Sequence, residues 1–290
     1  MKREESRPKA VILSAGQGTR LGAFTADRPK CLLPIHEEQS VLEEQLATLA
    51  ASGVEEALVV VGFGAEQVEE RIAQRPPPGI RVTTLYNPFF ATADNLVSCW
   101  LARPWMGEEF LLLNGDTLFE PRVLERLLVA PEAPLTLVVN EKDQYDADDM
   151  KVSVSGGRLQ AVGKTLELDT VTGESIGLMR FAPTGAKDFT EALEAAMRQP
   201  DALRCWYLSV VHGLAERMHI EALSITGLWW AEVDYPEDYQ AIRASFAGEG
   251  LQPEVTIAGR NGSGSTETAS PNPCQASARR CSSPGARARP

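Results

Sequence analysis

The most informative stretch of this chain is LSAGQGTRLGAFTADRPKCLLPI, residues 13–35. The β-branched run KAVILS, residues 9–14, leads into it and predicts a buried strand followed by a glycine loop. Small residues in such a loop let backbone N–H groups approach phosphate oxygens. The candidate nucleotide-binding residues are Leu13, Ala15, Gly16, Gly18 and Thr19. Arg20 and Lys30 add two positive charges, so the stretch predicts a site for a phosphorylated ligand.

Two better-known phosphate loops do not fit the sequence. A dinucleotide-binding fingerprint needs a third glycine, and Leu21 stands at that position after Gly16 and Gly18. A P-loop needs four residues between its first glycine and Gly-Lys-Thr. The run from Gly157 to residues 163–165 has five, and it lies between two predicted strands rather than before a helix. NAD binding and P-loop chemistry are therefore disfavoured.

Strands and helices alternate over the first 120 residues or so. This alternation is typical of a mainly parallel, doubly wound α/β sheet with helices on both faces. The predicted strands are residues 9–14, 57–63, 80–87 and 109–116, and the predicted helices are residues 40–53, 65–75 and 95–103.

The second half of the chain has a different pattern. Residues 134–181 contain short alternating runs and a Gly-Gly turn, which predict an antiparallel elaboration built from hairpins. Two helices at about 183–197 and 204–217, a strand pair within 222–234 and a terminal helix over 236–246 are expected to complete the fold.

The N-terminal stretch resembles the signature of the nucleotidyltransferases with a GT-A-like fold, which reads approximately GxGTRLxxxTxxxPKxLLPI. The matching residues are Gly16, Gly18, Thr19, Arg20, Leu21, Thr25, Pro29, Lys30, Leu32, Leu33, Pro34 and Ile35. The resemblance implies a GT-A or Rossmann-like sheet. It also implies that Arg20 binds the departing pyrophosphate and Lys30 the α-phosphate or the incoming phosphate. Such catalysis consists mainly of positioning and charge neutralisation.

Two aspartates are candidate metal ligands. Asp116 follows an apolar strand, at the carboxyl edge where open α/β sheets bind ligands, and Asp234 lies between the last predicted strand and a helix that starts with proline. Arg20 and Lys30 alone cannot neutralise the charge of the phosphate groups that such a site brings together. We therefore expect a divalent ion, Mg²⁺, held by oxygen ligands. Both residues resemble the family's metal aspartates, the second within E-[IV]-D-x-P-E-D. The alternative is that each only caps a helix or makes a turn.

The middle of the chain narrows the resemblance to the LicC-type phosphocholine cytidylyltransferase branch. The segments concerned are residues 86–103, 146–164 and 173–181. The resemblance implies CTP as the nucleotide and makes Asn87, Asn95 and Ser98 candidates for contacts to its base or ribose, since an amide presents both a donor and an acceptor. A role of the two asparagines in a turn and a helix start is the alternative.

The acceptor is expected to be a small phosphorylated molecule. Lys151 and Lys164 on the predicted hairpin could bind its phosphate, with exposed strand lysines as the alternative, and Glu174 with nearby aromatic residues suits an amine or a quaternary ammonium. Tyr207-Leu208-Ser209 stands where the branch is expected to have Tyr-Glu-Asp. That departure weakens the case for choline itself.

Composition limits the classes of partner. The formal net charge of the 290 residues is -12, which argues against a general nucleic-acid binder. No run approaches the ~18 apolar residues of a membrane span, and the N-terminus does not resemble a signal peptide, so a cytoplasmic protein is expected. A monomer or a homodimer is expected as well. Residues 1–250 are expected to form the nucleotidyltransferase domain. Residues 251–290, rich in Ser, Pro, Gly and Arg, are expected to be a disordered tail.

Three functions remain open at this level. The first is a Mg²⁺-dependent cytidylyltransferase that makes a CDP-alcohol and pyrophosphate from CTP and a phosphoryl alcohol or phosphonate. The second is a sugar-1-phosphate nucleotidyltransferase that uses GTP, UTP or dTTP. The third is a non-catalytic nucleotide-binding regulatory domain, against which the retention of Arg20, Lys30, Asp116 and Asp234 argues.

Overall fold

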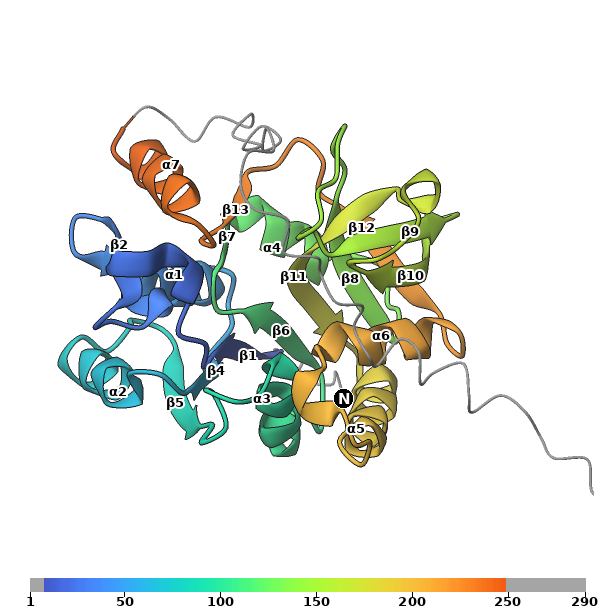
Figure 1. The fold of residues 1–290 in the computed structure, drawn as a ribbon, viewed down its shortest axis with the longest axis horizontal. Helices are drawn as coiled ribbons and strands as arrows, with labels where there is room; N and C mark the ends of the chain where they lie inside the picture. The colour runs from blue at the N-terminus through green and yellow to red at the C-terminus, as the bar shows by residue number, and fades with distance from the viewer. Residues whose placement is uncertain (1–7, 249–290) are drawn as a thin grey trace, which may run out of the picture.

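The computed structural model describes residues 8–248, so the predicted tail lies outside the described residues. A nine-stranded mixed sheet, in the order β5-β4-β1-β6-β11-β8-β12-β10-β9, runs through the molecule (Figure 1). Its strands are β1 (Lys9–Ser14), β4 (Glu56–Val61), β5 (Arg81–Tyr86), β6 (Phe110–Asn114), β8 (Leu135–Asn140), β9 (Lys151–Ser155), β10 (Arg158–Gly163), β11 (Gly173–Phe181) and β12 (Ile220–Ser224).

The N-terminal half confirms the predicted alternation of strand and helix. β5, β4, β1 and β6 are parallel neighbours, and helices connect them. The helices of this half are α1 (Val41–Ala51), α2 (Ala65–Gln74), α3 (Asn95–Ala102) and α4 (Pro121–Leu128). Because β1 lies between β4 and β6, the glycine loop that follows it opens at the carboxyl edge of the parallel strands.

The C-terminal half contains the predicted antiparallel part. β11 runs antiparallel to both β6 and β8, and β9 and β10 form a hairpin whose turn holds Gly156 and Gly157 at φ 58° and 78°. The predicted strand pair within residues 222–234 is wrong. β12 pairs parallel with β8, whereas β13 (Trp230–Glu232) pairs antiparallel with β7 (Thr117–Phe119) in a separate small sheet. Alternating apolar residues identified both strands, but distant segments determine their partners.

Helices cover both faces of the large sheet. Val11 and Leu13 of β1 pack in one apolar cluster with α3, α5 (Pro183–Ala196) and α6 (Tyr207–Ala215). Ala10 and Ile12 pack in the other, with α1, α2 and α4. Figure 1 shows α3 and α5 at the lower edge of the molecule, with α6 above α5. Successive residues of β1 thus point to opposite faces of the sheet, and both faces are apolar because the strand is buried on both sides.

A third apolar cluster joins the small sheet to the last helix, α7 (Pro236–Phe246). The remaining short elements are η1 (Thr19–Thr25), η2 (Lys30–Leu32), β2 (Pro34–His36), β3 (Gln39–Ser40), η3 (Arg103–Trp105), η4 (Leu168–Thr170) and η5 (Ala202–Arg204). The second C-terminal helix begins at Tyr207 rather than near residue 204, because Cys205 and Trp206 are extended. Within residues 8–248, no helix has the length and apolar character needed to cross a membrane.

Candidate active site

Lys30 joins the first sequence motif to the last. Its Nζ contacts Oδ2 of Asp116 and lies 3.1 Å from Oδ1 of Asp234. Asp116 lies in the turn between β6 and β7, and the pairing of β7 with β13 brings Asp234 to it. The N–H of Val233 donates to the carbonyl oxygen of Asp116 at 3.0 Å. Three residues that are far apart in the sequence thus form one charged cluster.

Electrostatics keep this cluster ionised. Burial by itself would lower the pKa of the Lys30 ammonium, yet Asp116 and Asp234 raise it above the ordinary lysine value. Burial would likewise raise the pKa of Asp234, but Lys30 and Arg20 lower it. The site therefore holds a charged ammonium and a charged carboxylate at neutral pH.

Arg20 occupies the other end of the cluster. Its guanidinium lies 3.4 Å from Asp234, 3.7 Å from Asp148 and 3.3 Å from the hydroxyl of Tyr235, whose ring it also faces. The Tyr235 hydroxyl donates to Asp148 at 2.8 Å. Tyr235 was not singled out from the sequence, although its position directly after Asp234 was a signal.

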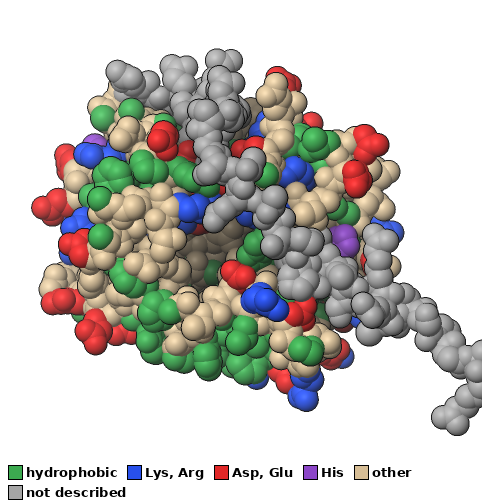
Figure 2. Space-filling model, viewed as in Figure 1, with side chains coloured by type: hydrophobic (Ala, Val, Ile, Leu, Met, Phe, Trp, Pro, Cys, Tyr) green, Lys and Arg blue, Asp and Glu red, His purple; other side chains and the backbone are tan. Residues whose placement is uncertain are grey.

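A cavity of about 290 Å³ opens beside these charges. Residues from the glycine loop, from the end of β6 and from the start of α3 line it: Leu13, Ser14, Gly16, Gly18, Thr19, Arg20, Lys30, Cys31, Asn95, Asn114, Gly115, Asp116 and Asp234. Figure 2 shows a hollow near the middle of this face with Lys and Arg side chains at its rim. Most of the predicted loop and charge residues thus share one cavity. Ala15 is not among its lining residues; its carbonyl oxygen accepts from the N–H of Phe63.

The carboxylates fit a divalent cation. Oδ1 of Asp116 is buried and has no hydrogen-bond partner in the described part of the chain. Oδ2 of Asp116 and Oδ1 of Asp234 both bind the Lys30 ammonium, so the two carboxylates already lie around one cation. Carboxylate oxygens are the ligands that Mg²⁺ prefers. Within residues 8–248, no group of three or more His, Cys, Asp or Glu side chains suited to a metal is present, so a cation here would use two carboxylates and oxygens of its substrates.

Gln45 fixes the turn that carries Asp116. Its Nε2 donates to the carbonyl oxygens of Asn114 and Thr117, each at 2.8 Å, and so brackets Gly115 and Asp116 from the side of α1. The side chain is 2% exposed. Sequence analysis missed this residue, although a glutamine on the apolar stripe of a helix was the available signal.

Among the predicted base or ribose ligands, Asn95 lines the cavity, while Asn87 and Ser98 are not among its lining residues. The Nδ2 of Asn87 donates to the Ser98 hydroxyl at 2.9 Å, and its Oδ1 accepts from the N–H of Phe89. Both ends of the Asn87 amide are therefore used inside the protein, in the turn that follows β5. This is the alternative role that the sequence left open for Asn87.

The predicted acceptor residues lie in two different settings. Lys164 sits 4.8 Å from the ring centre of Trp206 and 3.5 Å from Asp148, which also binds Arg20. Lys151 is 3% exposed, and its Nζ donates to the backbone carbonyl oxygens of residues 146, 149 and 164. Glu174 is also buried, and Lys142 pairs with it at 2.7 Å. Lys164 is therefore the predicted acceptor residue linked directly to the charged cluster.

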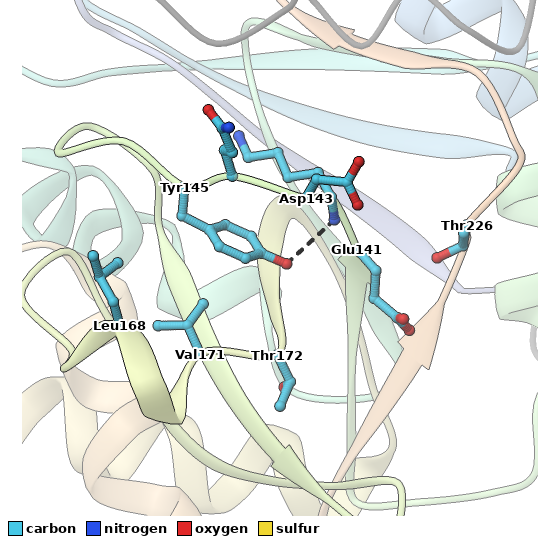
Figure 3. A pocket seen from close by; sticks show the side chains of 9 residues that line it. Glu141, Asp143, Tyr145, Leu168, Val171, Thr172 and Thr226 are labelled. Carbon is cyan, nitrogen blue, oxygen red and sulfur yellow. Dashed lines mark hydrogen bonds between the residues drawn. The ribbon is translucent and has the colours of Figure 1, made fainter.

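A second, larger cavity of about 860 Å³ lies elsewhere. Figure 3 shows its lining, which comes from residues 141–145 with Leu168, Val171, Thr172 and Thr226. The backbone N–H of Lys142 donates to the Tyr145 hydroxyl at 3.2 Å, and both residues line this cavity. None of the glycine-loop residues or the predicted metal aspartates lines this cavity, so the smaller one is the candidate active site.

Comparison with known proteins identifies the family of this chain. Residues 10–211 match the family described as the MobA-like NTP transferase domain. The chain belongs to this family. This NTP transferase domain is 35% identical over 238 residues, 79% of the chain, to the CMP-5'-(3-aminopropyl)phosphonate synthase of Streptomyces rubellomurinus. It is 28% identical over 112 residues, 39% of the chain, to the choline-phosphate cytidylyltransferase of Streptococcus pneumoniae. The domain spans 37% and 46% of the lengths of these two relatives.

A solved structure shares the fold. The structure of the CTP:phosphocholine cytidylyltransferase LicC from Streptococcus pneumoniae superposes with a TM-score of 0.66 and 18% identity, covering 82% of this chain and 98% of that one. The α/β nucleotidyltransferase fold and the resemblance to the cytidylyltransferase branch, both expected from the sequence, are thereby confirmed.

Proposed function

We propose that this NTP transferase domain is a cytidylyltransferase that moves CMP from CTP to a phosphoryl alcohol or a phosphonate, with Mg²⁺, and releases pyrophosphate. The names of its relatives support transfer of a cytidylyl group to a phosphorylated alcohol or a phosphonate, and the name of the LicC structure includes CTP. The observation that carries the proposal is the position of Lys30, whose ammonium meets the carboxylates of Asp116 and Asp234 at the wall of the cavity.

The reaction needs no covalent intermediate with the protein. An oxygen of the acceptor's phosphate or phosphonate attacks the α-phosphorus of CTP, and the bond from that phosphorus to the pyrophosphate oxygen breaks. Arg20 binds the charge that develops on the leaving pyrophosphate, and Lys30 binds the α-phosphate oxygens in the transition state. Mg²⁺ held by Asp116 and Asp234 would supply further charge neutralisation when bound.

The backbone of the glycine loop holds the triphosphate. Gly18 has φ 73° and stands directly before η1, so its N–H and those of its neighbours can turn toward an anion. A Cβ at Gly18 would lie 3.0 Å from Cβ of Lys30, so a larger residue would crowd the lysine that the reaction needs. Gly16 and Thr19 line the same cavity.

Lys164 is the proposed ligand of the acceptor's phosphate or phosphonate. It lies on the Trp206 ring and pairs with Asp148, which in turn contacts Arg20. This network connects the proposed acceptor position to the proposed pyrophosphate position through a single carboxylate. Exchange of Asp148 for a substrate phosphate would move both cations onto the substrates.

Pyrophosphate release tests the proposal. CTP, GTP, UTP, ATP and dTTP are each combined with phosphocholine, aminoethylphosphonate, aminopropylphosphonate, inositol phosphate and hexose 1-phosphates, with Mg²⁺ and again with excess chelator. We expect release with CTP and an alcohol phosphate or phosphonate, and none with chelator. Preference for another nucleotide with a hexose phosphate would establish a sugar nucleotidyltransferase instead. Absence of turnover with every pair would favour a non-catalytic nucleotide-binding domain.

A further inference from the structure

Two amide side chains that line the cavity share one partner, Tyr207. The backbone N–H of Tyr207 donates to Oδ1 of Asn95 at 3.1 Å, and its phenol donates to Oδ1 of Asn114 at 2.9 Å. Asn95 begins α3, Asn114 ends β6 and Tyr207 begins α6. Three elements thus meet through two hydrogen bonds made by one residue.

These bonds fix which end of each amide is free. A backbone N–H can only donate, so the atom of Asn95 that it meets has to be the amide oxygen. The Tyr207 phenol donates to Oδ1 of Asn114, so this bond leaves the Nδ2 end of that amide unused. Within residues 8–248, neither amide nitrogen has a hydrogen-bond partner. Both residues line the cavity, so each amide keeps Nδ2 hydrogens for a ligand bound there.

Each member of this arrangement is held firmly. Tyr207 is fully buried. Its N–H lies in the first turn of α6 and has no partner within that helix, so Asn95 accepts its hydrogen bond. The amide of Asn114 packs against Gly177, which has φ +73°. A Cβ at Gly177 would lie 2.2 Å from Nδ2 of Asn114, so only glycine leaves the amide its place.

We infer that Tyr207 is a positioning residue that orients Asn95 and Asn114 so that both present N–H donors to the nucleotide bound in this cavity. The inference rests on the proposed function, because the ligand it addresses is the nucleoside triphosphate. The glycine loop lines the same cavity, which places the two donors beside the nucleotide rather than at Lys164. Phosphate and ribose oxygens accept such donors, whereas an ammonium group would be repelled there.

Nucleotide binding tests this inference directly. The dissociation constant of CTP is measured by calorimetry with Mg²⁺ for the whole chain and for Tyr207→Phe, which removes only the hydroxyl. We expect the constant to rise about tenfold, the size of one misplaced hydrogen bond. Tyr239→Phe is the matched control. Tyr239 is buried like Tyr207, with 3% of its surface exposed. Its hydroxyl donates to the carbonyl oxygen of Pro34, which does not line the cavity.

Double variants separate positioning from a general structural effect. Since the phenol reaches Asn114 and not Asn95, Tyr207→Phe is expected to have no further effect on CTP affinity in Asn114→Ala and its full effect in Asn95→Ala. Equal effects in both backgrounds, or unchanged affinity in Tyr207→Phe, would overturn the inference and leave the proposed function standing. Failure of the unaltered chain to bind CTP or any other nucleoside triphosphate would overturn both.

Discussion

The ammonium of Lys30 lies 3.1 Å from a carboxylate oxygen of Asp234, a residue 204 positions later in the chain. Lys30 belongs to the N-terminal glycine-loop motif, and Asp234 follows the last strand. The same Lys30 atom contacts Asp116, at the end of the parallel half of the sheet. One side chain therefore holds the start, middle and end of the domain around a single cavity, and its removal is the most direct perturbation of the site.

Replacement of Lys30 by alanine is expected to lower turnover by about 10²-fold, since one well-placed donor contributes on the order of 3 kcal/mol to transition-state stabilisation. Steady-state pyrophosphate release measures this loss. Lys187→Ala, at an exposed position of α5, is the control and should retain full activity. Turnover in Lys30→Ala within twofold of that of the control would contradict the role of Lys30.

Asp116→Asn and Asp234→Asn test the metal site. Each exchange removes one charged oxygen ligand while keeping the shape of the side chain, so we expect turnover to fall severely and the remaining activity to require more Mg²⁺. Titration of activity against Mg²⁺ gives the apparent affinity. Asp188→Asn on the exposed part of α5 is the control. An unchanged Mg²⁺ dependence in both active-site variants would remove these aspartates as ligands.

Gln45→Met should affect both stability and activity. The methionine keeps the volume but leaves the carbonyl oxygens of Asn114 and Thr117 without their donor, at a cost of about 1–3 kcal/mol in the free energy of unfolding. Turnover should fall as well, because the bracketed turn carries Asp116. Denaturant unfolding and pyrophosphate release measure the two effects. Gln160→Met, at an exposed position, is the control and should change neither stability nor turnover. Full activity in Gln45→Met would show that the turn that carries Asp116 keeps its shape without the Gln45 hydrogen bonds.

Glu43 predicts a pH dependence of stability. Burial by itself would raise the pKa of Glu43, but hydrogen bonds from Arg71 and Ser40 lower it. Its contribution is therefore present above the unfolded-state value of about 4.3 and is lost as the pH falls through the lowered value in the folded protein. We expect Glu43→Gln to cost about 1 kcal/mol at pH 7 and progressively less toward pH 3.

Urea unfolding of this variant between pH 3 and pH 7 measures that dependence. Glu125→Gln, at an exposed position of α4, provides the baseline. A stability difference for Glu43→Gln that stays constant over this range would show that the carboxylate charge of Glu43 contributes nothing.

The two hairpin lysines should respond differently to removal of their charge. Lys164→Met is expected to raise the KM for the acceptor about tenfold with little change in stability, because Lys164 lies at the charged cluster. Lys151→Met is expected to lower the free energy of unfolding by about 1–3 kcal/mol, since its ammonium satisfies buried carbonyl oxygens. Acceptor kinetics and unfolding of both variants measure the contrast, and the opposite pattern would return Lys151 to the acceptor site.

Local patterns predicted much of the fold. The strand and helix alternation of the first half, the Gly156-Gly157 hairpin and the terminal helix depend on hydrophobic periodicity and turn residues, which act over a few positions. The partners of β12 and β13 could not be predicted in this way. Strand pairing over long sequence distances depends on which surfaces remain to be buried once the rest has packed.

The sequence by itself determined the glycine loop, its two cations and the two candidate metal aspartates, because each belongs to a short motif whose chemistry follows from residue type and spacing. Only the tertiary structure decided that Lys30 joins Asp116 to Asp234, that Gln45 brackets the Asp116 turn, and that Tyr207 uses the oxygens of Asn95 and Asn114. These contacts join residues that lie between 69 and 204 positions apart in the sequence. Their geometry depends on packing, which no local pattern of residues encodes.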